Sequence, residues 1–220
     1  MFDFDGLIAD TETPLFESWC QEFRDHGVEL SVHEWIKCVG AGPGGWNVLD
    51  HLESLVGSVD RTTLDSRNVE RHHAALVDLC ALPGVVELLD EAQSHSIPCA
   101  VASSSGFDWV DGVLRQIGIR ERFHSLATRD MVASAKPAPD LFLKACEKLG
   151  TDPSAAAALE DSVNGVIAAK AAGMVCVAVP NPVTTHFDFG HADARIDSMH
   201  MATVAMLEDL VAKARSQALS

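Results

Sequence analysis

The sequence predicts an α/β fold, namely a doubly wound, mostly parallel sheet with an inserted all-helical domain. Short apolar runs alternate with helical patterns from Leu82 onward, as in βαβ architectures. The stretch from Thr11 to Ala81 shows helical patterns without clear intervening strands. Hydrophobic residues make up 47% of the 220 residues, which is enough for one sizeable domain or a core with a smaller insert.

The strands of the core are expected where short apolar runs are continuous, because a strand buried on both faces shows no polar alternation. The run at residues 97–102 (IPCAVA) is followed by runs at residues 123–127, 155–159, 174–179 and 194–196. Helices are expected at residues 84–95, 107–117, 139–149, 163–172 and 200–216. Gly118, Gly150 and Gly173 follow three of them as stop signals.

The insert is expected to contain helices at residues 13–26, 46–55 and 61–79, and a short helix opened by a Ser31-x-x-Glu34 capping box. We therefore assign residues 1–11 and 82–220 to an α/β core and residues 12–81 to an inserted helical cap. We expect the core to carry the candidate catalytic residues described below and the cap to cover them. The glycine-rich stretch at residues 40–45 is interrupted by Pro43 and has no preceding strand, which predicts a flexible cap loop rather than a dinucleotide site.

The net charge bears on the partners of the protein, and its cysteine usage bears on its compartment. The chain has 16 Lys and Arg against 32 Asp and Glu, so its net charge of −16 disfavours nucleic acid and anionic membranes. An anionic substrate would need a metal ion or a local basic cluster. The six cysteines are scattered, and none of them forms a CxxC pair. The sequence shows neither a recognisable signal peptide nor an apolar run of 18 residues. We expect a cytoplasmic protein, with a monomer favoured.

Polar residues stand where the predicted strands end, and ligands of open parallel sheets bind at this edge. Taken singly, each could be a helix cap, a turn or a solvated loop. Four such segments in one chain instead favour a catalytic site. They contribute Asp3 and Asp5, then Ser103 to Ser105, then Lys136, then Glu160 and Asp161.

The residue types suit phosphoryl transfer. Clustered carboxylates repel one another unless a cation lies among them, and Mg²⁺ prefers hard oxygen ligands. Asp3, Glu160 and Asp161, with a backbone carbonyl near Asp5, could supply those ligands. Asp3 could attack phosphorus, while Asp5 protonates the leaving oxygen and later deprotonates water.

Two further groups could bind the phosphate. Ser103 and adjacent backbone N–H groups could hold a phosphate oxygen, with Ser104 as a further contact. Lys136 could offset the charge on the nucleophile and the phosphoryl group. Arg67 and Arg71, four apart on one cap helix, either form a solvated face or reach the distal part of the substrate.

The motifs FDFDGLIADTE, VASSS, KPAPD and LEDSVNGVIAAKAAGM resemble the four motifs of the haloacid dehalogenase (HAD) superfamily, most closely its β-phosphoglucomutase-like subgroup with a small helical cap. The resemblance covers nearly the whole chain. It implies a HAD-like Rossmannoid core, Asp3 as nucleophile and Asp5 as general acid/base. It also implies Ser103 as the phosphate-binding hydroxyl and Lys136 as the charge-balancing lysine.

The resemblance further implies Mg²⁺ bound by Asp161 directly and by Glu160 directly or through water. The dehalogenases of the superfamily lack the second aspartate, so Asp5 favours phosphoryl transfer. Two departures stand out. Members usually carry several more residues before the nucleophile, so either the native chain begins earlier or the sheet is unusually short at its centre. Leu15 stands where the mutases carry a cap histidine, which disfavours mutase activity.

We therefore expect a Mg²⁺-dependent phosphatase that acts on a small phosphorylated metabolite, with sugar phosphates as candidates. A phosphomutase that uses the same nucleophile is one alternative. The other is a non-catalytic phosphate-binding or regulatory protein on the same fold, although a pure binder would not need both Asp3 and Asp5.

Overall fold

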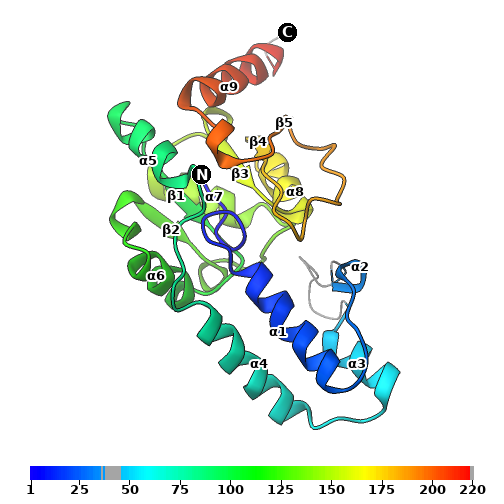
Figure 1. Ribbon diagram of the computed structural model, residues 1–220. Helices are drawn as coiled ribbons and strands as arrows, with labels where there is room; N and C mark the ends of the chain where they lie inside the picture. The colour runs from blue at the N-terminus through cyan, green and yellow to red at the C-terminus, as the bar shows by residue number, and fades with distance from the viewer. Residues whose placement is uncertain (36, 38–45, 219–220) are drawn as a thin grey trace. The chain divides into compact units, whose positions relative to one another are not determined.

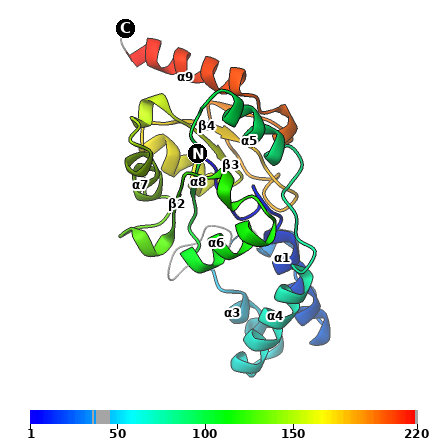
Figure 2. The same cartoon turned by 90° about the vertical axis from the view of Figure 1, so that its left-hand side faces the viewer.

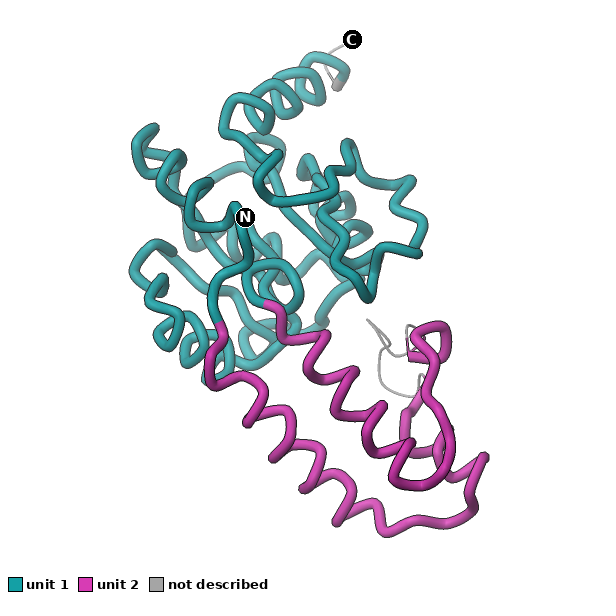
Figure 3. Tube along the Cα trace, viewed as in Figure 1, with its two compact units in different colours: residues 1–9, 80–220 teal, residues 10–79 magenta. Residues whose placement is uncertain are grey.

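The computed structural model describes residues 1–35, 37 and 46–218, and it divides the chain into two compact units (Figure 3). The core unit comprises residues 1–9 and 80–220, and the helical unit comprises residues 10–79. Both junctions fall two residues earlier than the sequence suggests. The predicted glycine-rich loop at residues 40–45 lies outside the described residues.

The core unit is built on a parallel sheet, as predicted. Its strands are β1 (Ala100–Ala102), β2 (Ser125–Ala127), β3 (Ala157–Glu160), β4 (Val175–Ala178) and β5 (Ala194–Arg195). β1 pairs with β2, and β3 pairs with β4, which also pairs with β5. Phe2 joins the two groups, because it forms parallel bridges with Val101 and with Leu159. The segment around Phe2 therefore lies at the centre of the sheet.

Helices and short 3₁₀ turns connect the strands (Figures 1 and 2). The helices are α5 (Val85–Ser94), α6 (Phe107–Gln116), α7 (Asp140–Leu149), α8 (Val163–Ala171) and α9 (Val204–Ala218). The 3₁₀ turns are η1 (Arg120–Arg122), η2 (Arg129–Met131), η3 (Pro153–Ala155) and η4 (Met199–Met201).

Helices cover both faces of the sheet, which gives the doubly wound arrangement. α7 and α8 pack against the strands through a cluster that includes Phe142 and Met174. The strand residues in that cluster are small, for example Ala102 and Ala158, so the two helices can approach the sheet closely. Alternate strand residues such as Val101 point to the opposite face, and α9 contacts β3, β4 and α5.

Several elements are shorter than predicted, for local reasons. β1 begins at Ala100 rather than at residue 97, because Pro98 has no N–H to donate to a neighbouring strand. The backbone N–H of Cys99 donates to the Nδ1 atom of His124 instead (3.3 Å). The last helix begins at Val204 because residues 199–201 form the 3₁₀ turn η4.

The helical unit contains α1 (Glu12–Asp25), α2 (Val32–Trp35), α3 (Val48–Val56) and α4 (Arg61–Ala75). Side-chain caps fix two helix starts: Asn47 accepts from the N–H groups of Leu49 and Asp50, and Asp60 accepts from Thr63. α1 and α4 pack against each other. Among the described residues, each helix is too short or too polar to cross a bilayer.

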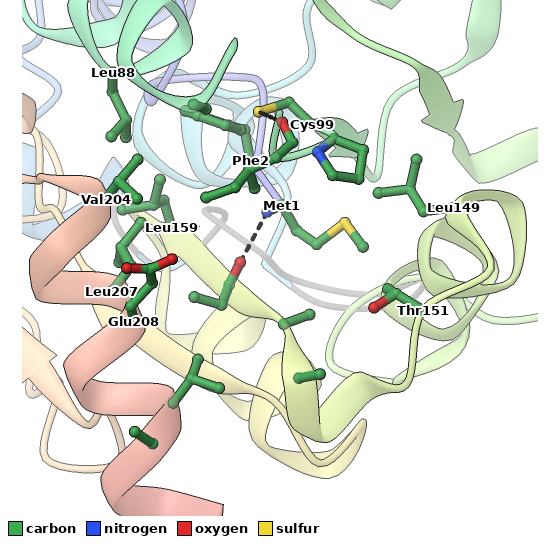
Figure 4. Close-up of a pocket in the computed structure, with 18 of the residues that line it drawn as sticks. Met1, Phe2, Leu88, Cys99, Leu149, Thr151, Leu159, Val204, Leu207 and Glu208 are labelled. Atoms are coloured by element: carbon green, nitrogen blue, oxygen red, sulfur yellow. Dashed lines mark hydrogen bonds between the residues drawn. The ribbon is translucent and has the colours of Figure 1, made fainter. Parts of the chain in front are cut away.

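A cavity of about 490 Å³ lies beside the amino ends of β1 and β3 (Figure 4). Its lining is mostly apolar and includes Leu88, Leu149 and Leu207. The amino group of Met1 donates to the carbonyl of Ala157 there (2.8 Å). Because it lies at the amino ends of the strands, this cavity is separate from the edge where the predicted site residues are expected.

Candidate active site

The predicted core residues meet at the carboxyl ends of the strands. Asp3 follows the central bridge at Phe2, and its N–H donates to the carbonyl of Leu159 (3.0 Å). Ser103 follows β1 and donates its N–H to the carbonyl of Ala127 (2.9 Å). Glu160 is the last residue of β3. Backbone pairing thus sets the depth of each side chain along the sheet.

A buried cluster of three acids forms the centre of the site. One carboxylate oxygen each from Asp3, Glu160 and Asp161 lies within 4.8 Å of the others. The exposed fractions of these residues are 7%, 0% and 3%. Three buried carboxylates in this arrangement form an all-oxygen donor set, which fits a hard divalent cation such as Mg²⁺.

Lys136 compensates part of this negative charge. Its Nζ atom forms ion pairs with Asp3 and, at 2.5 Å, with Glu160. Burial, and after it the charge of Glu160, raise the pKa of Asp3 to about 8 against the opposing effect of Lys136. Burial would lower the pKa of Lys136, but the two carboxylates outweigh it and raise that pKa. Three buried carboxylates face one ammonium group in this cluster, so it would gain from a further cation.

Glu160 is held by the start of α8. Its Oε2 atom accepts from the N–H (3.2 Å) and the hydroxyl (3.0 Å) of Ser162, which also caps the helix. Gly165 makes room for the Glu160 carboxylate, because a Cβ atom at this position would collide with it. Sequence reasoning missed Gly165, although the spacing from Glu160 within EDSVNG places both at one helix start.

Asn181, which follows β4, was also missed. Its Nδ2 atom donates to Asp161 (2.7 Å) and to the carbonyl of Gly6 (3.3 Å). Its Oδ1 atom accepts from the N–H groups of Val183 (2.9 Å) and Thr184 (3.0 Å), so the orientation of the amide is fixed. Applying the strand-end rule to β4 could have found this residue. Asn181 links the acid cluster to the turn that carries Asp5.

Asp5 lies among hydrogen-bond donors from the segment after β1. Ser105 donates its hydroxyl to the Oδ2 atom of Asp5 (2.5 Å), and Trp109 donates its indole N–H to Oδ1 (3.0 Å). The hydroxyl oxygen of Ser103 accepts from the N–H of Ser105 (3.0 Å), so the hydroxyl proton of Ser103 points elsewhere. Ser104, selected from the sequence as a substrate contact, is exposed.

Arg67 and Arg71 contact Glu22 within the helical unit. The carboxylate of Glu22 is fully buried, and it accepts from Arg67 Nε (3.0 Å) and Arg71 (2.8 Å). Arg71 also donates to Asp25 (2.7 Å). These contacts join α4 to α1. The two arginines are therefore neither a simple solvated face nor free cations, and the geometry favours a structural role for them.

Comparisons with known proteins identify the family to which the chain belongs. Residues 1–179 match the family described as haloacid dehalogenase-like hydrolase. The chain is 40% identical over 210 residues to "Putative phosphatase YhcW" of Bacillus subtilis, covering 95% of each chain. It is 37% identical over 208 residues to hexitol phosphatase B of Escherichia coli, covering 90% of this chain and 91% of that one.

A solved structure has a similar fold. It is a HAD family hydrolase from Deinococcus radiodurans with bound phosphate and sodium, 26% identical and with a TM-score of 0.77. The alignment covers 97% of this chain and 94% of that one. The superfamily predicted from the four motifs is therefore confirmed, together with a set of relatives that includes phosphatases.

Proposed function

Since the chain belongs to the haloacid dehalogenase-like hydrolase family, we propose that it is a Mg²⁺-dependent phosphatase that acts on a small phosphorylated metabolite through an aspartyl-phosphate. The observation that carries the proposal is the contact of buried Lys136 with both Asp3 and Glu160. It supports a nucleophilic carboxylate held inside a charge-compensated acid cluster. Asp161 completes that cluster.

Asp3 attacks phosphorus in the first step, and the ester P–O bond breaks as the Asp3–phosphorus bond forms. Asp5 gives its proton to the leaving oxygen. In the second step a water molecule attacks phosphorus and gives a proton to Asp5, which releases Asp3 and phosphate. The side chains of Asp3, Glu160 and Asp161, with a backbone carbonyl near Asp5, would hold Mg²⁺. When bound, the ion neutralises charge on the phosphoryl oxygens.

The remaining residues bind and orient the phosphoryl group. The hydroxyl of Ser103 is oriented by the N–H of Ser105, so it can donate to a phosphoryl oxygen. Lys136 stays close to Asp3 and balances the charge that develops there. Ser104 is exposed next to these groups in sequence and remains a candidate substrate contact.

The choice of phosphatase over mutase rests on Leu15. A mutase must prevent water from attacking the aspartyl-phosphate until a second sugar hydroxyl is bound, and a cap histidine assists the mutases in this. Leu15 can neither donate a hydrogen bond nor carry charge. Relatives named as phosphatases support the same choice, and hexitol phosphatase B supports sugar and polyol phosphates as the substrate class. The helical unit would select among these substrates.

The test is turnover of a panel of sugar and polyol phosphates with Mg²⁺, in the parent and in Asp3→Asn. The variant should lose turnover while remaining folded, because an amide is a poor nucleophile of nearly the same shape. Asp5→Asn should slow turnover by about 10²–10⁴-fold. Near-parental activity of Asp3→Asn, or full activity in chelator, would overturn the mechanism.

Two controls separate the alternatives. β-Glucose 1-phosphate with Mg²⁺ and a trace of the bisphosphate should release inorganic phosphate without accumulating glucose 6-phosphate. Rapid isomer formation with little phosphate release would assign a mutase instead. A purely phosphate-binding protein would turn over neither the panel nor a generic aryl phosphate.

A further inference from the structure

The carboxylate of Asp5 accepts from the hydroxyl of Ser105 at Oδ2 and from the indole N–H of Trp109 at Oδ1, and both donors are neutral. We propose that Trp109 is a positioning residue that keeps Asp5 in one orientation through both steps of the reaction, with Ser105 as its adaptable partner. The proposal deepens the proposed function and rests on the acid/base role of Asp5 in it.

The chemistry of the two donors differs, and this difference assigns a role to each oxygen. An indole N–H can only donate, so Trp109 must face a lone pair of Oδ1 in every state. A proton on Oδ2 leaves that hydrogen bond undisturbed, so Oδ2 is assigned the transferable proton of Asp5. A hydroxyl can rotate, so Ser105 donates to one lone pair of Oδ2 when that atom is bare and can turn away when Oδ2 carries the proton, which leaves that proton free to reach the leaving oxygen.

This pairing lets the proton move without rotation of the carboxyl group. In the first step the proton leaves Oδ2 for the oxygen of the departing alcohol while the ester P–O bond breaks. In the second step Oδ2 receives a proton from the water that attacks phosphorus. Trp109 keeps the same hydrogen bond to Oδ1 throughout, so the group stays aligned with the reacting oxygens.

Both donors stand on rigid supports. Trp109 lies in the first turn of α6, and the fully buried Val110 and Leu114 anchor that helix in the core. The N–H of Phe107 donates to Asp130 (3.0 Å), which fixes the start of the helix. The N–H of Ser105 donates to Ser103, and its carbonyl accepts from the N–H of Arg129 (2.9 Å). A site held by such supports keeps its geometry.

The experiment compares two substrates by kcat/KM, which reports phosphoryl transfer to Asp3. An alkyl phosphate that the parent enzyme hydrolyses needs a proton on its leaving oxygen, whereas p-nitrophenyl phosphate releases a stable anion and needs little help. Trp109→Phe keeps an aromatic ring but loses the N–H. It should lower kcat/KM for the alkyl phosphate about 10- to 100-fold, leave p-nitrophenyl phosphate nearly unchanged, and leave KM unchanged.

Conservative variants and a double-mutant comparison distinguish a positioning role of Trp109 from a packing role. Trp109→His retains a ring N–H and should recover part of the loss, and Ser105→Thr should retain more activity than Ser105→Ala. In an Asp5→Ala background, Trp109→Phe should cause no further loss for the alkyl phosphate. Thermal melting of each variant checks the fold, and Trp109→His serves as the test if Trp109→Phe melts early.

An equal loss on both substrates, or a full further loss in the Asp5→Ala background, would return Trp109 to a packing role and overturn the inference. Parental activity of Trp109→Phe alongside an inactive Asp5→Ala would also overturn the inference but leave the proposed function intact. Full alkyl phosphatase activity of Asp5→Ala would instead overturn the proposed function, and the inference with it.

Discussion

Gly165→Ala should damage the site although Gly165 carries no side chain and no proposed catalytic role. The added methyl group would occupy the space that the Glu160 carboxylate now fills at the start of α8. Glu160 has no exposed surface, so its carboxylate cannot swing into solvent. Either it turns away from Lys136 and Ser162, or α8 moves.

The magnitude follows from overpacking. An extra methyl group in a well-packed interior typically costs about 1–3 kcal/mol. In a chain of this size each kcal/mol lowers the melting temperature by about 2–4 °C, so the expected decrease is about 2–12 °C. Activity should fall at least about tenfold, because displaced Glu160 no longer holds Lys136 beside Asp3.

The assay pairs thermal melting with kcat/KM, and the chain offers a matched control. Gly112 is an exposed helical glycine in α6, and a Cβ atom at this position would have no neighbouring atom within 4 Å. Gly112→Ala should therefore raise stability by about 0.5–1 kcal/mol and leave activity unchanged. Glu160→Ala removes the clashing group, so Gly165→Ala should cost little further stability in that background. Parental melting and activity of Gly165→Ala would refute the reasoning.

Three further outcomes are expected. Asn181→Ala should weaken Mg²⁺ binding about 10- to 100-fold by calorimetry, since Asn181 orients Asp161, and an unchanged affinity would contradict this. In chelator, the free energy of unfolding measured in urea should fall as pH rises from about 4 to about 8, because native Asp3 keeps a proton that the unfolded chain releases. Asp3→Asn should flatten this pH profile. An unchanged slope in that variant would exclude Asp3 as the source of the pH dependence. Arg67→Ala should lower the free energy of unfolding by about 1 kcal/mol, because Glu22 keeps its ion pair with Arg71. Removing both arginines should lower it by about 3–5 kcal/mol in urea titration, because the buried carboxylate of Glu22 then has no arginine to pair with. Small additive losses would show that burial of an unpaired Glu22 carboxylate does not destabilise the fold.

The fold and the family could be predicted from the sequence because local patterns carry them. Apolar runs and glycine stops located the strands and helices, and the strand-end rule located Asp3 and Ser103. Element boundaries were less predictable, because they depend on single backbone donors. The N–H of Cys99, for instance, bonds to His124 rather than to a strand.

The supporting residues of the site could not be predicted, because their roles depend on neighbours distant in sequence. Nothing near Trp109 in the chain indicates that its N–H meets Asp5, 104 positions away. The same holds for Asn181, which contacts Asp161 and Gly6. Arg67 and Arg71 were correctly placed on one helix face, but their partner Glu22 lies on another helix.

The central position of Phe2 has a consequence for folding kinetics. Its two strand partners, Val101 and Leu159, lie 99 and 157 positions further along the chain, beyond the whole helical unit, so the middle of the sheet closes only after long loops have closed. Pairings of such high contact order form slowly. Asp3, the next residue, should thus reach its place late, and phosphatase activity should return after most of the helical signal when the unfolded protein is diluted from denaturant.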